Sequence, residues 1–79
     1  MDKKYFTYDC EIAAALAASG HKYIPFLNDD GRVHFEFSYD DVSYDVDRYW
    51  SNSFIIDAKT LMGALAMVKK DINKIKFSR

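Results

Sequence analysis

The sequence predicts a small α+β domain, in which a three-stranded, mainly antiparallel sheet has helices packed on it. The first observation is the alternation over residues 32–38, where Val33, Phe35 and Phe37 are apolar and the residues between them are polar. The second is the pair Asp30-Gly31, which is typical of a turn between two strands. The third is an apolar repeat at helical spacing near the C-terminus. The expected order is strand, helix, strand, strand, helix, a possible fourth strand, helix.

The hairpin of residues 23–38 is expected to set the core. If Asp30-Gly31 forms its loop, Phe26 lies opposite Phe35, and Ile24 lies opposite Phe37; a four-residue loop of residues 28–31 keeps the same side chains on the same face. The core side of the sheet is then Ile24, Phe26, Val33, Phe35 and Phe37. Pro25 cannot donate a ladder hydrogen bond, so its strand, residues 22–27, is predicted to lie at an edge.

The first strand and helix follow from local signals. Residues 3–8 are rich in aromatic and β-branched side chains and stop at Asp9, which predicts a strand followed by a helix cap. The Ala-rich segment 10–19 predicts a helix that ends at Gly20. A strand, helix and strand followed by a hairpin places the strand of residues 32–38 between the other two.

Two more helices are expected after the sheet. Residues 41–51 predict the first, capped by Ser38 or Asp40. Residues 54–56 suit either a short link or a fourth strand. Asp57 is expected to cap the last helix, residues 58–76. The apolar stripes of the two helices are Val42, Val46, Tyr49 and Trp50 in the first, and Leu61, Leu65, Val68, Ile72 and Ile75 in the second.

Length and composition limit the classes of function. The 79 residues suit one domain over residues 1–79, and 49% hydrophobic with 16% aromatic residues argues against disorder. A net charge of -1 gives no overall field for nucleic acid or membrane. Cys10 is the single cysteine and cannot form an intrachain disulfide, and no apolar signal segment is visible at the start. We therefore expect a cytoplasmic protein with no membrane association.

Residues with reactive side chains are scattered along the chain. Cys10 in the first turn of a helix could be a nucleophile, but a partly buried structural role is the stronger expectation. His21 and His34 lack metal-ligand spacing, and His34 is expected to be solvated and cross-strand from Leu27. The three glycines form no phosphate-binding loop. We therefore expect no enzyme, metal, cofactor or small-molecule substrate.

Two surfaces are candidates for a protein partner. One is an acidic and aromatic segment after the third strand, where Tyr44 is expected to face solvent; an ordinary solvated helix face is the alternative. The other is the uncovered face of the sheet, which the second helix, a partner or a second copy of the chain would cover. Its expected apolar members are Tyr23, Pro25 and Leu27, with Tyr5 and Thr7 or Phe6 and Tyr8. The candidate partner-binding residues are Tyr39, Asp40, Asp41, Tyr44, Asp45, Tyr23, His34 and Glu36.

A basic cluster supports an alternative function. It consists of Lys69, Lys70, Lys74 and Lys76, with Arg79 after them. Such lysines could contact phosphate in a small nucleic-acid-binding regulator. They also lie at the negative end of the helix dipole, where cations are stabilising without any ligand. Nucleic acid is therefore the weaker expectation.

Two stretches are similar to a known family. They are YFTYDCEIAAALAASG at residues 5–20 and YWSNSFIIDAKTLMGAL at residues 49–65, with a Gly-Arg-Val strand between them. Together they resemble a family of small uncharacterised proteins of phages, prophages and their bacterial hosts. The resemblance implies a phage or mobile-element protein in a host cytoplasm, and it carries over no catalytic or binding residue. The leading hypothesis is a non-enzymatic protein that binds another protein, such as an effector of host defence, in the manner of an anti-CRISPR protein.

Overall fold

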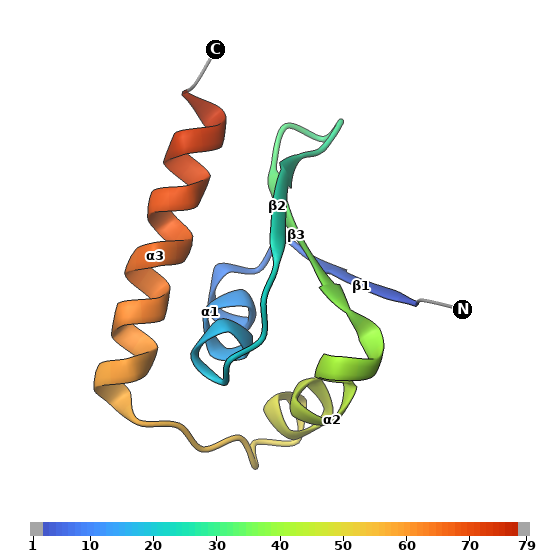
Figure 1. The fold of residues 1–79 in the computed structure, drawn as a ribbon, viewed down its shortest axis with the longest axis vertical. Coiled ribbons are helices and arrows are strands. Elements are labelled where there is room, and N and C mark those ends of the chain that lie inside the picture. Colours follow the sequence, from blue (N-terminus) through green and yellow to red (C-terminus); the bar gives the residue numbers. More distant parts are fainter. Residues whose placement is uncertain (1–2, 78–79) are drawn as a thin grey trace.

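The computed structural model describes residues 3–77, and β3 lies in the middle of its three-stranded sheet. The strand order is β1-β3-β2, and both pairings are antiparallel. This confirms the predicted α+β class and strand order, and residues 54–56 form a link rather than a strand. The elements are β1 (Lys4–Thr7), α1 (Cys10–Ala18), β2 (Ile24–Leu27), β3 (Val33–Ser38), α2 (Tyr39–Trp50) and α3 (Ala58–Lys76) (Figure 1).

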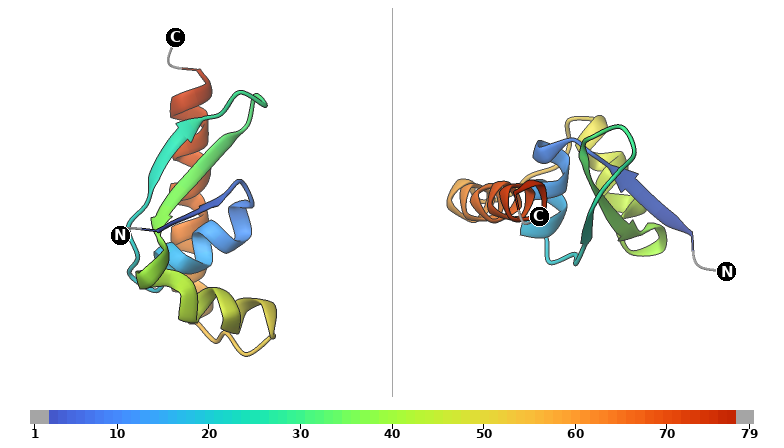
Figure 2. Two further views of the ribbon diagram at one scale, coloured as in Figure 1. Left: turned by 90° about the vertical axis from the view of Figure 1, so that its right-hand side faces the viewer. Right: turned by 90° about the horizontal axis from the view of Figure 1, so that it is seen from above.

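The helices leave one face of the sheet uncovered. α1 and α3 lie together on one face, and α2 continues from the end of β3 and packs against α1 below the sheet (Figures 1 and 2). The core fills the space between these helices and the sheet. Its largest fully buried side chains are Phe35, Phe37, Ile12, Leu16, Val42 and Val68.

Side-chain caps fix the starts of two helices. The Asp9 carboxylate accepts a hydrogen bond from the Glu11 amide at 2.9 Å, and that of Asp57 accepts one from the Thr60 amide at 3.0 Å. Both caps were expected from the sequence and are confirmed. α2 begins earlier than predicted, at Tyr39. The apolar stripe of α3 faces the core as expected, whereas Trp50 of α2 is 64% exposed and does not extend the stripe of that helix into the core.

The hairpin loop has three residues, 29–31, and this changes the register of β2. The Asn28 amide donates to the Arg32 carbonyl at 2.8 Å, and the Gly31 amide donates to the Asn28 carbonyl at 3.0 Å. Gly31 has a φ of +82°, a left-handed conformation that suits glycine. An odd loop moves β2 by one residue relative to a loop of two or four residues, so Phe26 lies opposite His34. The expected pairings of Phe26 with Phe35 and of Ile24 with Phe37 are therefore wrong.

A one-residue shift turns every side chain of β2 to the other face. Ile24 is 61% exposed and does not belong to the core, and Phe26 lies beside His34 on the uncovered face. Tyr23 packs edge-on against Phe35 instead, with 5.1 Å between ring centroids. The side of β2 that faces the core thus holds Tyr23, Pro25 and Leu27, which the sequence had assigned to the uncovered face.

Pro25 lies in an edge strand, as predicted. Antiparallel partners alternate between hydrogen-bonded and non-hydrogen-bonded pairs. Because Asn28 and Arg32 are a bonded pair, Pro25 and Phe35 form a non-bonded pair, three positions along the ladder. The backbone nitrogen of Pro25 therefore points away from β3, and the N–H that proline lacks would not have contributed to this sheet.

Tyr23 connects the hairpin to α3. Its hydroxyl donates to the Asp71 carboxylate at 2.5 Å. Burial, followed by the hydrogen bond and the negative charge of Asp71, raises the pKa of Tyr23 above its ordinary value of 10.0. The folded state favours the neutral phenol, so this contribution to stability is complete below pH 10 and is lost as the pH rises above it.

We expect the free energy of unfolding to fall as the pH rises above about 10, and Tyr23→Phe to weaken this dependence. At pH 7 the free energy of unfolding of Tyr23→Phe should be about 1 kcal/mol lower than that of the wild type, because one hydrogen bond to a partly exposed carboxylate is removed. Urea unfolding at each pH measures both effects. Tyr44→Phe, at a side chain that is 71% exposed, is the control and should keep the wild-type dependence. An unchanged alkaline loss in Tyr23→Phe would contradict the assignment.

Candidate functional site

The uncovered face of the sheet, called here the open face, is built from alternate residues of the three strands. Phe6 of β1 and Ile24 of β2 flank Glu36 of β3, and Phe26 of β2 lies beside His34 of β3. The side chains of Phe6 and Ile24 are 52% and 61% exposed. Apolar side chains therefore meet solvent on the side of the sheet that α1 and α3 do not cover. The open face consists of Lys4, Phe6, Tyr8, Ile24, Phe26, His34 and Glu36.

Rings on this face pack against one another in a row. Phe6 meets Phe26 edge to face with 6.0 Å between centroids. Phe26 lies 5.8 Å from His34, and His34 lies 5.3 Å from Tyr8. The Arg32 guanidinium then sits 4.5 Å above the Tyr8 ring. Rings that support one another in this way are held in place before any partner arrives, which lowers the entropic cost of binding.

Charged groups surround the rings. Lys4 and Glu36 form an ion pair at 3.4 Å, and His34 Nε2 lies 3.0 Å from an Asp30 carboxylate oxygen. Asp30 also accepts the backbone N–H of Arg32, and that bond, followed by the contact with His34, lowers the pKa of Asp30. Charges of both signs therefore lie beside the rings, and Glu36 lies between Phe6 and Ile24 in the middle of the face.

The open face contains only part of the set expected from the sequence. His34 and Glu36 lie on it, and the first strand and the residue after it contribute Phe6 and Tyr8 rather than Tyr5 and Thr7. Tyr23 is absent from it, because the side chain packs into the core and bonds to Asp71. His34 lies opposite Phe26 rather than Leu27 and is stacked between rings instead of being simply solvated. Sequence reasoning missed Ile24 and Phe26 because their facing depends on the register.

The acidic and aromatic segment of α2 is divided between solvent and structure. Tyr39, Asp40, Asp41 and Tyr44 are exposed, and for Tyr44 this confirms the expected orientation. Asp45 is different, and its side chain is only 17% exposed.

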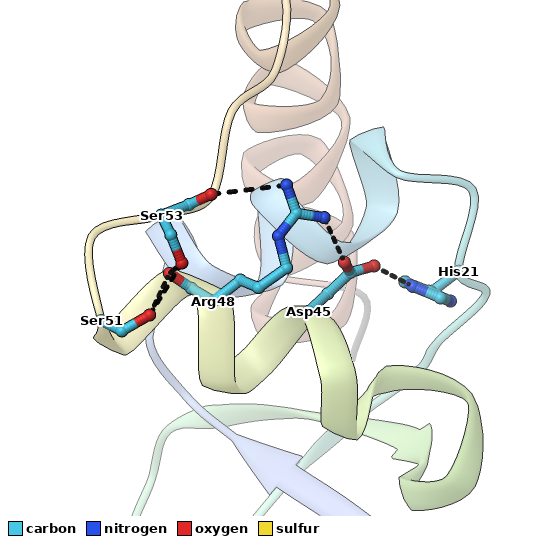
Figure 3. A network of polar contacts seen from close by, with 5 residues as sticks. All are labelled: His21, Asp45, Arg48, Ser51 and Ser53. Carbon is cyan, nitrogen blue, oxygen red and sulfur yellow. Dashed lines mark hydrogen bonds and ion pairs between the residues drawn. The ribbon is translucent and has the colours of Figure 1, made fainter.

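Figure 3 shows Asp45 between two basic side chains. One carboxylate oxygen lies 2.7 Å from His21 Nε2, and the other accepts from Arg48 Nη1 at 3.5 Å. The Arg48 guanidinium also donates to the Ser53 carbonyl at 3.4 Å. Asp45 therefore joins α2 to the segment before β2 and to the link before α3. The carboxylate of Asp45, a candidate for binding a partner, is thus already bonded within the chain.

The basic cluster of α3 lies apart from the open face. Lys69, Lys70, Lys74 and Lys76 are all exposed, and Arg79 lies outside the described residues. Lys70 and Lys74 border a shallow hollow with Asn73 and Phe77. α3, which carries these lysines, lies on the side of the sheet opposite the open face (Figure 2).

The groups considered for chemistry lie apart. Cys10 packs against the core cluster at the start of α1, whereas His34 lies on the open face. Among residues 3–77, no three His, Cys, Asp or Glu side chains are grouped so that they could hold a metal ion. Within the same range, no helix combines the length and apolarity needed to cross a membrane.

Comparisons with known proteins add no family to this description. Protein-family models, curated proteins and solved structures were searched, and none of them matches the chain.

Proposed function

We propose that this chain is a non-enzymatic protein that binds another protein on the open face of its sheet. The observation that carries the proposal is the row of packed rings on the face that no described helix covers, with Phe6 and Tyr8 each 52% exposed. Contiguous apolar surface of this kind usually marks an interaction site.

The chemistry of the open face suits a protein surface. Aromatic side chains dominate the energy of many interfaces, and each square ångström of buried apolar area contributes about 25 cal/mol. Lys4, Glu36, Asp30 and Arg32 supply charges of both signs around the rings, which would fix the orientation of the partner. The partner is expected to present apolar groups together with charges of both signs.

The resemblance noted in the sequence suggests where to look for this partner. It implies a phage or mobile-element protein in the cytoplasm of a bacterial host, and inhibition of a defence effector is the role that this setting favours. A second copy of the chain is the other occupant to test, because an apolar sheet face can be hidden by dimerisation.

Capture from a bacterial host lysate, followed by mass spectrometry, tests the proposal. We expect the immobilised chain to retain a stoichiometric partner, and Phe6→Ala with Phe26→Ala to reduce retention at least about tenfold. Asp41→Ala with Tyr44→Ala is the matched control on α2 and should retain the partner. Light scattering of the purified chain shows whether a second copy is that partner.

Two outcomes would contradict the proposal. One is loss of the partner in the Asp41 and Tyr44 variant with full retention in the Phe6 and Phe26 variant, which would place the interface on α2. The other is capture of nucleic acid alone. In a mobility-shift series, contacts from Lys69, Lys70 and Lys74 to phosphate would weaken steeply as the salt concentration rises, and this separates the two functions.

A further inference from the structure

A groove lies among the helices, away from the open face. Its boundaries are α1, the end of α2, the link of residues 51–57 and the first turns of α3, and its volume is about 640 Å³. Ala14 and Ala15 form its floor, where their small side chains leave room. Tyr49, Trp50 and Phe54 are among its walls. We call it the helical groove, and its volume is in the range of sites that hold a ligand.

The helical groove has one acidic side chain at its edge. Glu11 is the charged residue among the described ones that line it, and it is exposed at the start of α1. Within residues 3–77 its carboxylate makes no hydrogen bond or ion pair. Burial, followed by the charges of Asp9 and Glu11, raises the pKa of Tyr49. The carboxylates of Asp9 and Glu11 therefore make the electrostatic potential at Tyr49, a residue of the groove, more negative.

Among residues 3–77, the Trp50 ring of the helical groove lacks the neighbouring cation that several other rings have. Lys3 sits 4.9 Å from the Tyr39 ring centroid, and Arg32 sits 4.5 Å from that of Tyr8. Tryptophan is the ring that attracts cations most strongly. Trp50 is 64% exposed, and no Lys or Arg side chain in the described part of the chain lies over its ring. It packs edge-on against Tyr49, which holds its ring in place.

The Arg48 guanidinium lies close to the groove, but it is already bonded within the chain. Arg48 lies 5.9 Å from the Phe54 ring, but it bonds to Asp45 and to the Ser53 carbonyl. The charge of Glu11 and the face of Trp50 thus remain open to a cation from outside the chain.

We propose that the helical groove binds a short segment of a partner protein that presents an Arg or Lys side chain flanked by apolar ones. The cation is recognised by Glu11 and Trp50 together, and the apolar neighbours lie on the floor of Ala14 and Ala15. The Asn52 side chain, also at the groove, supplies an amide for the backbone of that segment. This site is separate from the open face in residues and elements, so either proposal can fail without the other.

Trp50 is the only tryptophan of the chain, so its fluorescence reports on the groove directly. The probe is an acetylated, amidated hexapeptide of alternating Leu and Arg. We expect a saturable blue shift of the emission, and about a fivefold increase in Kd for Glu11→Gln, as for the loss of an ion pair worth about 1 kcal/mol. Met62→Lys, at a 61% exposed side chain of the groove, places a competing cation there and should abolish the shift.

Control variants and peptides separate recognition of charge from non-specific hydrophobic binding. Asp29→Asn removes an exposed carboxylate at the distant hairpin tip and should bind the peptide as the wild type does. A peptide with Gln in place of Arg should bind at least about fivefold more weakly. Equal binding of the Gln peptide, an unchanged Kd in Glu11→Gln, or an emission spectrum that does not move at millimolar peptide would each overturn the proposal. Amide shifts in NMR spectra that fall on the open face rather than on the groove would do so too.

Discussion

Replacing Phe35 by Ala is expected to lower the free energy of unfolding by about 3 to 5 kcal/mol, the largest loss among the substitutions considered. Phe35 lies on the central strand and has no exposed surface. Its ring packs against that of Tyr23, with 5.1 Å between the centroids. Removing a buried Phe side chain costs about 3 to 5 kcal/mol, because apolar contact is lost and a cavity remains. A domain of this size has a total stability of roughly 4 to 12 kcal/mol. Urea unfolding followed by circular dichroism measures the loss.

Phe6→Ala is the matched control for this prediction. It makes the same substitution on the neighbouring strand, at a side chain on the opposite face that is 52% exposed. We expect a loss of about 1 kcal/mol, since much of the ring already meets water. Similar losses for Phe35→Ala and Phe6→Ala would mean that the two faces of the sheet are not buried as described.

Replacing Asp45 by Ala is expected to cost about 2 kcal/mol, the second largest loss. The change removes the acceptor of both His21 and Arg48, and it leaves the Arg48 guanidinium without its carboxylate. Arg48 also donates to the Ser53 carbonyl. When Arg48 loses its carboxylate partner, the link before α3 should therefore become less ordered. Urea unfolding measures the first effect, and hydrogen exchange of residues 51–56 measures the second.

Asp47→Ala is the control for charge on the same helix. Asp47 is exposed, and within residues 3–77 its side chain makes no hydrogen bond or ion pair. We expect its stability to stay within about 0.5 kcal/mol of the wild type. Equal stability of Asp45→Ala and Asp47→Ala would show that the contacts in Figure 3 contribute nothing to folding.

Local signals were enough to predict the elements and their order. The helix caps Asp9 and Asp57 could be predicted from the sequence, and the alternation around Phe35 identifies the central strand. The register of β2 could not be predicted in this way, because Asp30-Gly31 suits loops of even and odd length. The left-handed Gly31 and the bond between Asn28 and Arg32 select the odd loop, and the facing of β2 follows from it.

The candidate sites depend more on tertiary structure. His34 and Glu36 could be placed on the open face by alternation alone, but Ile24 and Phe26 could not, since the register decides their side. The contact between Asp45 and His21 joins residues 24 positions apart and could not be predicted from the sequence. The spacing of Asp45 and Arg48, three residues apart on one helix, is the only part of this network that the sequence indicates. Ala14 and Ala15 form the floor of the helical groove only because of the segments that surround them.

The orientation of Pro25 has a consequence for how the molecule behaves when crowded. β2 is an outer strand of the sheet, and its free backbone groups could template a fourth strand from a neighbouring molecule. At Pro25 the outward position holds a ring carbon instead of a donor, so an incoming strand would find a gap in the ladder there. The outer edge of β2 is thus a poor template for open-ended polymerisation into fibrils.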